Sequence, residues 1–189
     1  MKNIMNKELE LRMYFLVLYS LSGIQKGIQC GHAAIEYERK FKNTTLYNYW
    51  ANHHKTFIIL DGGTTNDGVV SCYGEEPAIG TLQECEKLLN ENNINFATFK
   101  EPDLNGSLTS ISLIADERVF NHKDYPNFMW FCEDKMDQIT WIKEFKNRPY
   151  DSSYLSKQYP ELYNKWFTLI GNERNIFLKD FLQNFKLAH

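Results

Sequence analysis

The stretch Met13-Tyr14-Phe15-Leu16-Val17-Leu18-Tyr19 is an unbroken apolar run between polar residues. A run of this length without polar alternation is typical of a strand buried on both faces of a sheet. A small polar turn follows at residues 20–23, and from 25 to 41 the apolar residues recur at helical spacing. A strand, a tight turn and a helix form a βα unit, so we predict an α/β protein.

Further elements follow from the same kind of pattern. We expect helices over 45–54 and 81–92, strands over 56–60, 95–100 and 108–115, and a long loop over 61–79. Thr81 and Glu84 have the spacing of a capping box. The small residues Gly31, Ala33 and Ala34 are expected to let the first helix pack close to a sheet. The short connection between the last two strands favours an antiparallel hairpin. The prediction is a small four-stranded mixed sheet with helices on both faces.

The pattern changes after residue 117. We expect helices over 136–145, 161–170 and 173–187, and a loop over 147–160 that contains two prolines. The tryptophans Trp130, Trp141 and Trp166 argue against disorder and are expected to be core residues rather than platforms for nucleobases. We therefore predict an α/β domain over residues 1–117. A helical C-terminal extension over 118–189 is expected to pack on it, without a separate core.

Composition narrows the classes of function. The net charge of −3 and the isoelectric point of about 6.0 argue against a surface coated with positive charge for long nucleic acid, although a local basic patch stays open. The four cysteines, Cys30, Cys72, Cys85 and Cys132, show no zinc-type spacing, so we expect reduced thiols and no metal. The apolar run is too short for a signal peptide or a membrane span. A cytoplasmic protein without membrane contact is expected.

A six-residue motif on the predicted first helix carries a resemblance to a known family. Gln29-Cys30-Gly31-His32-Ala33-Ala34 resembles the Gln-Cys-Ser-His-Ala-Ala signature of the type II (archaeal/eukaryotic-type) peptidyl-tRNA hydrolases, at the same place on that helix. The order of elements matches as well, over about residues 12–116. The resemblance implies an ester hydrolase that acts on peptidyl-tRNA or N-blocked aminoacyl-tRNA. It also implies that no cofactor is needed, that the tRNA 3′ end is the partner, and that a homodimer forms.

The predicted hairpin carries the second match. Family members have an Asp at the end of the third strand and a fourth strand rich in Thr. Here Glu101 keeps an acid at that place, Asp103 follows two residues later, and Thr109, Ser110 or Ser112 offers a hydroxyl. The family's turn motif, Asp-Ala-Gly-Arg-Thr-Gln, is absent.

The chain departs from the family before the first helix. Family members carry Gly-Lys-Gly-Lys there, and the last lysine is counted as catalytic. When the family motif is aligned without a gap on Gln29-Cys30, its last lysine falls on Gln25 of this sequence. Lys26 comes one residue later. One residue rotates a helical side chain by about 100°, so Lys26 reaches the expected site only if the turn is rebuilt.

The resemblance also implies roles for individual residues. Ester hydrolysis needs an activated water, a stabilised oxyanion and a bound substrate terminus. Glu101 and Asp103 would orient or activate the water, Lys26 would hold a phosphate or the oxyanion, and Thr109 would complete the hydrogen bonds. The expected substrate-binding residues are Ser22, Gly23, Gln25, Gln29, His32 and Asn105.

Each candidate also has an ordinary structural explanation. Lys26 suits a solvated surface, Asp103 and Asn105 suit a turn, and Thr109 suits a pleated strand. Cys30 suits a small buried position better than a nucleophile. Two other functions therefore stay open: a non-catalytic module that binds a tRNA end, a nucleotide or a protein, and chemistry on a different nucleotide-containing substrate.

Overall fold

The computed structural model describes residues 8–65, 79–147 and 152–189. The chain divides into two compact units. The sheet unit comprises Met1–Asp116 with Asp180–His189, and the helical unit comprises Glu117–Lys179. The domain boundary expected at residue 117 stays a prediction.

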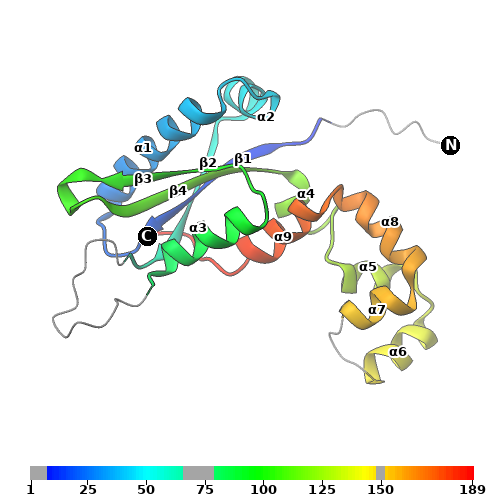
Figure 1. Ribbon diagram of the computed structural model, residues 1–189. Helices are drawn as coiled ribbons and strands as arrows, with labels where there is room; N and C mark the ends of the chain where they lie inside the picture. The colour runs from blue at the N-terminus through cyan, green and yellow to red at the C-terminus, as the bar shows by residue number, and fades with distance from the viewer. Residues whose placement is uncertain (1–7, 66–78, 148–151) are drawn as a thin grey trace, which may run out of the picture. The chain divides into compact units, whose positions relative to one another are not determined.

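The sheet unit is built on four strands, as predicted. These are β1 (Leu11–Leu18), β2 (Thr56–Gly63), β3 (Phe96–Glu101) and β4 (Ser107–Asp116), in the spatial order β2-β1-β4-β3 (Figure 1). β1 runs parallel to β2 and antiparallel to β4, and β3 and β4 form the expected antiparallel hairpin. The mixed four-stranded sheet is confirmed, and the central position of β1 explains why its residues from Met13 to Leu18 are apolar and buried.

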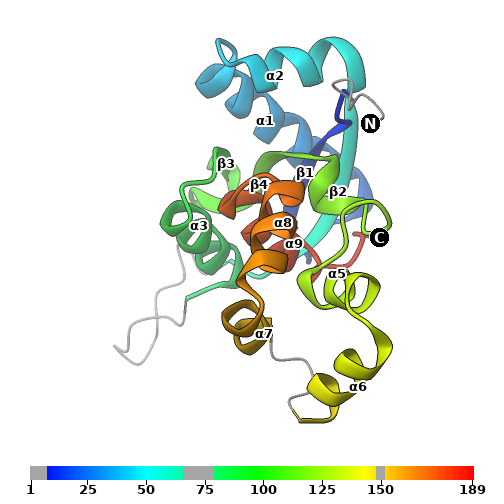
Figure 2. The ribbon, with the colours of Figure 1, turned by 90° about the vertical axis from the view of Figure 1, so that its right-hand side faces the viewer.

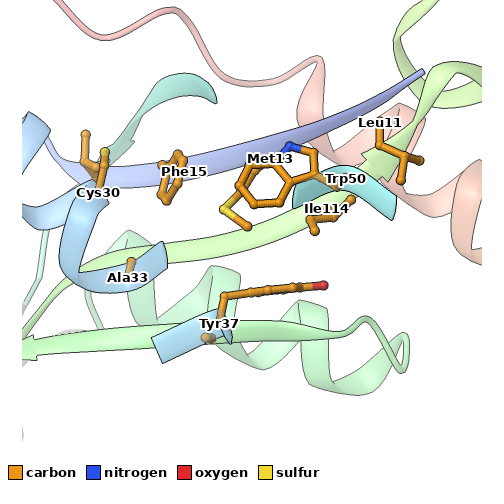
Figure 3. Close-up of a cluster of buried hydrophobic side chains, with 10 residues drawn as sticks. Leu11, Met13, Phe15, Cys30, Ala33, Tyr37, Trp50 and Ile114 are labelled. Carbon is orange, nitrogen blue, oxygen red and sulfur yellow. The ribbon is translucent and has the colours of Figure 1, made fainter. Parts of the chain in front are cut away.

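Helix α1 (Gly23–Phe41) covers one face of the sheet. Its buried residues include Cys30, Ala33 and Tyr37, which face Met13 and Phe15 of β1 (Figure 3). Ala33 is fully buried, whereas a Cβ added at Gly31 would meet nothing within 4 Å. The expectation that Gly31 permits a close approach is therefore wrong. Ala33 is the small residue that packs against the sheet.

Helix α3 (Thr81–Glu91) covers the opposite face, through contacts with β1, β2 and β4 (Figures 1 and 2). Leu82, Cys85 and Leu89 are its buried residues. The approach is close at Gly62, where an added Cβ would lie 2.6 Å from Leu82 Cδ2 and 3.0 Å from the Leu16 main-chain carbon. Only a residue without a side chain fits there, so this glycine is required for packing.

The start of α3 differs from the prediction. Gly80 is the N-cap and gives no side-chain hydrogen bond, so the capping box expected from Thr81 and Glu84 is wrong. The Thr81 hydroxyl instead donates to the Gly62 carbonyl at 2.9 Å and accepts from the Thr64 N–H at 2.7 Å. It thereby ties α3 to the end of β2. β2 includes residues 61–63, which were expected in a loop. The rest of that expected loop from residue 66 to 78, with Cys72, lies outside the described residues.

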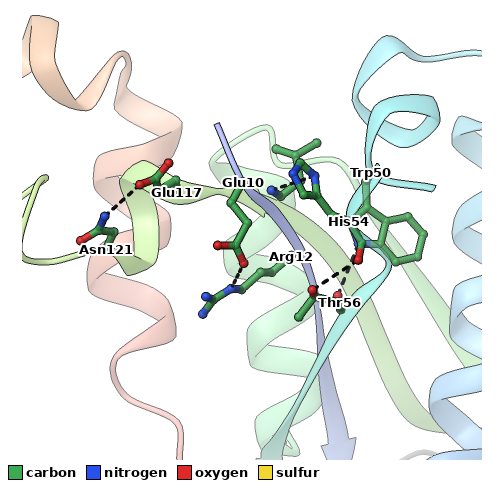
Figure 4. A network of polar contacts seen from close by, with 8 residues as sticks. Glu10, Arg12, Trp50, His54, Thr56, Glu117 and Asn121 are labelled. Atoms are coloured by element: carbon green, nitrogen blue, oxygen red, sulfur yellow. Dashed lines mark hydrogen bonds and ion pairs between the residues drawn. The ribbon is translucent and has the colours of Figure 1, made fainter. Parts of the chain in front are cut away.

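Helical structure over 45–54 is confirmed, but it changes type along the segment. α2 (Thr45–Tyr49) continues as η1 (Trp50–His54), a π-helix, before the chain turns at Lys55 with φ 54°. Near its end the Trp50 indole N–H donates to the Thr56 carbonyl, and His54 Nδ1 accepts from the Leu11 N–H, each at 3.3 Å (Figure 4). These bonds tie the second helical segment to the starts of β1 and β2.

The last residues of the chain pair with the free edge of β2. The Asp61 N–H donates to the Lys186 carbonyl at 2.9 Å, and the Ala188 N–H donates to the Ile59 carbonyl at 3.0 Å. An antiparallel bridge joins Leu60 and Leu187 between these bonds. A helix was expected as far as residue 187, but α9 (Glu173–Leu182) ends earlier and this short extended segment follows it.

The helical unit contains more helices than the sequence predicted. Its helices are α4 (Glu117–Phe120), α5 (Phe128–Lys135), α6 (Gln138–Asn147), α7 (Ser152–Gln158), α8 (Pro160–Ile170) and the first part of α9. α4 and α5 were not predicted, and the loop expected over 147–160 is wrong where α7 forms. Short helices carry few turns of periodic pattern, so their signal is weak.

We expected no separate core in this part of the chain, and that expectation is wrong. Phe128, Phe131, Leu155, Trp166 and Ile170 belong to one buried cluster within the helical unit. The Trp166 indole N–H donates to the Pro126 carbonyl at 2.9 Å, which satisfies its polar atom inside the cluster. The core role expected for Trp166 is confirmed, but Trp130 is 56% exposed.

Among the described residues, no helix combines the length and the apolar composition that a bilayer span requires.

Two glycine substitutions should have opposite effects on the sheet unit. Gly31→Ala is expected to stabilise it by about 0.5–1 kcal/mol, because glycine inside a helix is unfavourable and the added Cβ has open space. Gly62→Ala is expected to destabilise it by about 1–3 kcal/mol, because the added Cβ overlaps Leu82. Hydrogen exchange of the β1 amides measures both free energies. Equal effects would contradict the close packing at Gly62.

Candidate functional site

A chain of three polar side chains joins α1 to the β3–β4 hairpin. The Thr109 hydroxyl donates to Gln29 Oε1 at 2.5 Å, and Gln29 Nε2 donates to Glu101 Oε2 at 2.6 Å. Thr109 and Gln29 are buried, and Glu101 is half-buried. α1 and the hairpin therefore converge at one end of the sheet. The two hydrogen bonds lead from the buried Thr109 hydroxyl to the half-buried Glu101 carboxylate.

An irregularity in the sheet makes this chain possible. Side chains of a regular strand alternate between faces, so Thr109 and Ser112 would point in opposite directions. Both donate to α1, Thr109 to the Gln29 side chain and Ser112 to the Ala33 carbonyl at 2.9 Å. The register of β3 against β4 shifts just before this point. A bulge re-aims side chains in this way, so it directs Thr109 to the α1 face.

The chemistry of the three groups fixes the direction of the hydrogen bonds. A carboxylate only accepts, so the Gln29 amide must turn its NH₂ group to Glu101 and its oxygen to Thr109. Glu101 Oε2 is thereby held, and Oε1 receives only a long contact of 3.5 Å from the Asp103 N–H. Oε1 keeps lone pairs that can take a proton from a water or a hydroxyl group.

Lys26 is not part of the hydrogen-bonded series from Thr109 through Gln29 to Glu101. Its side chain is buried, and its ammonium group donates to the main-chain oxygen of His189 at 3.1 Å. No ion pair connects Lys26 and Glu101, both of which lie among the described residues. The expected catalytic lysine is therefore held by the C-terminal segment and not by the acid.

The residues expected to bind substrate at the start of α1 form a helix cap. Ser22 is the N-cap, and its hydroxyl accepts from the Gln25 N–H at 3.4 Å. The Gln25 side-chain oxygen accepts from the Ser22 N–H at 3.0 Å, which completes a capping box. Gly23 is the first helical residue, and a Cβ added there would meet nothing within 4 Å.

The other candidate residues form no side-chain hydrogen bond with Thr109, Gln29 or Glu101. His32 is exposed and stacks on the Phe99 ring with 4.5 Å between the centroids. Asp103 is exposed on the short 3₁₀ turn η2 (Pro102–Leu104), and Asn105 follows it with φ 55°. Asn105 thus has the turn role that was its structural alternative.

A further hydroxyl on β4 has no partner. Ser110 Oγ is buried and makes no hydrogen bond within the described part of the chain, although Thr109 and Ser112 on either side both make one. Buried polar atoms normally have a hydrogen-bond partner, so the unpaired Ser110 hydroxyl beside Thr109 is an exception.

Cys30 lies inside the family-like motif but is unsuited to attack a substrate. It is 1% exposed, and burial raises the pKa of its thiol to about 12. The thiolate is the reactive form of cysteine, so this thiol is inert near neutral pH. The structural role expected for Cys30 is confirmed. Within the described ranges, no three His, Cys, Asp or Glu side chains gather as metal ligands would.

The sequence analysis missed the contribution of the C-terminal segment. His189 holds Lys26 across a separation of 163 residues, and the segment before it pairs with β2. Neither contact has a local sequence signal, because each depends on where the sheet brings the chain.

Two comparisons with known proteins gave no match. No family model matches this sequence, and no curated protein matches it.

The Gln29–Thr109 bond should give a coupled stability effect. Gln29→Met and Thr109→Val are each expected to lower the free energy of unfolding of the sheet unit by about 1–3 kcal/mol, because each leaves a buried partner unpaired. The double variant should lose less than the sum, because neither partner is then left alone. Hydrogen exchange of the β4 amides measures the three values. Strictly additive effects would argue against the bond.

Cysteine reactivity tests the burial of the thiols. Burial raises the pKa of Cys30 to about 12 and those of Cys85 and Cys132 to about 11. In a Cys72→Ser background, a disulfide reagent at pH 8 should label none of these three thiols rapidly in the native protein. It should label all three in concentrated guanidinium chloride, which serves as the control. Rapid labelling of Cys30 in the native protein would contradict its assignment as an inert core residue.

Proposed function

We propose that this protein hydrolyses the ester bond of peptidyl-tRNA or of N-blocked aminoacyl-tRNA, with the reaction centred on Glu101. The observation that carries the proposal is the hydrogen-bonded chain from Thr109 through Gln29 to Glu101. It links the glutamine of the family-like motif on α1 with the acid of the family-like hairpin. Gln29 and Glu101 are 72 residues apart in the sequence, and each lies in a segment that resembles the same family. We infer that the two segments contribute to one site.

The proposed role of Glu101 is to accept a proton from water. Gln29 fixes one carboxylate oxygen, and the other is free to bind the attacking water. As the water oxygen bonds to the ester carbonyl carbon, its proton passes to Glu101. The same proton then goes to the ribose oxygen as the carbon–oxygen bond breaks. Asp103 is close in sequence and exposed, which suits a role in orienting the water.

The proposed roles of the remaining residues concern binding. Thr109 keeps Gln29 in place, and the uncovered His32–Phe99 stack provides a flat surface beside the acid. The first N–H groups of α1 offer donors for a phosphate or for the carbonyl oxygen that becomes negative. A homodimer remains part of the proposal because the resemblance implies it, and a cytoplasmic location remains part of it because the cysteine spacing favours reduced thiols.

A second candidate function is a non-catalytic module that binds a tRNA end, a nucleotide or a protein. The contact between Lys26 and the His189 main-chain oxygen favours it, because the lysine expected to stabilise charge in the reaction is engaged elsewhere. Binding of tRNA at this site without turnover would support this module over the hydrolase.

The hydrolase proposal predicts a specific loss of activity. Purified protein should release the peptide from N-acetyl-aminoacyl-tRNA, and Glu101→Gln should lower the rate about tenfold or more, because removal of a general base costs at least that. Release of labelled N-acetyl-amino acid from tRNA, followed over time, measures the rate.

A matched substitution controls for the loss of one negative charge. Glu91→Gln changes an exposed carboxylate at the end of α3 and should leave the rate within twofold of the wild type. Turnover no higher than in a mock purification would remove the hydrolase proposal. An equal loss in both variants would remove the role given to Glu101.

A further inference from the structure

A cavity of about 640 Å³ lies within the helical unit, between the segment before α5, α5 itself and α8. Trp130, Phe131 and Leu169 supply apolar lining, and Lys123, Lys135 and Lys165 supply positive charge. The volume is within the usual range of small-ligand sites. The cavity is formed by residues of this unit alone, so it is distinct from the Glu101 site.

The aromatic side chains of the cavity differ in exposure. Phe131 is buried and belongs to the core of the unit, whereas Trp130 leaves 56% of its surface exposed. α5 places both on neighbouring positions, and Asn127 caps the helix by accepting from the Trp130 main-chain N–H at 3.0 Å. A large exposed aromatic surface on a capped helix is a preorganised platform for a flat ring.

The charges of the cavity favour an anionic ligand. Its two acids are engaged, since Asp134 pairs with Lys135 at 2.6 Å and Asp124 accepts from Asn121 at 2.9 Å. Lys123 and Lys165 form no ion pair or hydrogen bond with another described residue. His122 adds a donor, because its Nδ1 faces the Lys179 ammonium at 3.2 Å and its Nε2 then carries the proton. The two unpaired lysines are suited to a phosphate.

We propose that this cavity binds a nucleotide unit, with the base stacked on Trp130 and the phosphate held by Lys123 and Lys165. A flat ring joined to a phosphate is the ligand chemistry that meets both features. Base–aromatic stacking tolerates any base, so the site would show little sequence preference. The proposal does not depend on ester hydrolysis at Glu101. A free mononucleotide and a single-stranded nucleic acid both contain such a unit, and competition between the two separates these sources.

The test uses the full chain with adenosine monophosphate, a short single-stranded oligo(A) RNA and the same RNA in a duplex. Fluorescence anisotropy of labelled RNA, competition by the mononucleotide and quenching of tryptophan emission measure binding. We expect single-stranded RNA to bind with a Kd of about 100 μM or tighter at low salt. Competition by the mononucleotide at a similar concentration would identify a free nucleotide as a sufficient ligand, and binding of RNA alone would identify the strand as the source.

The variants assign binding to the cavity. Trp130→Ala should weaken binding by about fivefold or more, and Trp130→Phe should retain most of it, because a ring remains for stacking. Lys123→Gln and Lys165→Gln should each reduce the slope of log K against log salt by about 0.7. Lys157→Gln changes an exposed lysine of α7 outside the cavity, and this matched control should bind with the wild-type slope. Unchanged binding by Trp130→Ala, or no binding of any ligand, would overturn the proposal.

Discussion

The burial of β1 on both faces is the constraint on which the sheet unit depends. β1 pairs with β2 on one side and with β4 on the other, and seven of its eight residues are buried, all except Arg12. A strand in this position needs a helix over each face, and α1 and α3 provide them. The pairing of β1 with β4 also brings the hairpin beneath α1. The approach of Gln29 to Thr109 is therefore a consequence of how the hydrophobic strand is covered.

The buried polar residues Gln29, Thr109 and Lys26 each have a hydrogen-bond partner, whereas the Ser110 hydroxyl has none among the described residues. Thr109 and Gln29 are removed from water and satisfy each other, while the charged member of their chain, Glu101, stays half-buried where water can reach it. Lys26 is buried as well, and a main-chain oxygen is its acceptor. The same hydrogen bonds that make these groups tolerable in the interior also fix their positions. A site assembled in this way is rigid on its inner side and accessible at the carboxylate.

The sequence predicted the elements that have a long periodic or apolar pattern. The run from Met13 to Leu18 predicts the central strand, and the sequence motifs indicate both Glu101 and Gln29, which are hydrogen-bonded to each other in the structure. The errors have physical causes. Thr81 bonds to β2 instead of capping α3, and Lys26 meets His189, because contacts between distant segments override local patterns. α5 and α7 are too short to give a clear period, and the independent core of the helical unit is visible only once its aromatic side chains are placed in space.

The pairing of the C-terminal segment with β2 has a consequence for how the protein behaves at high concentration. β2 is an outer strand, and its unpaired N–H and C=O groups are a template on which another chain can add a strand. Residues 186–188 occupy part of that edge with two hydrogen bonds of their own chain. Three residues thus act as an internal blocker of intermolecular strand addition.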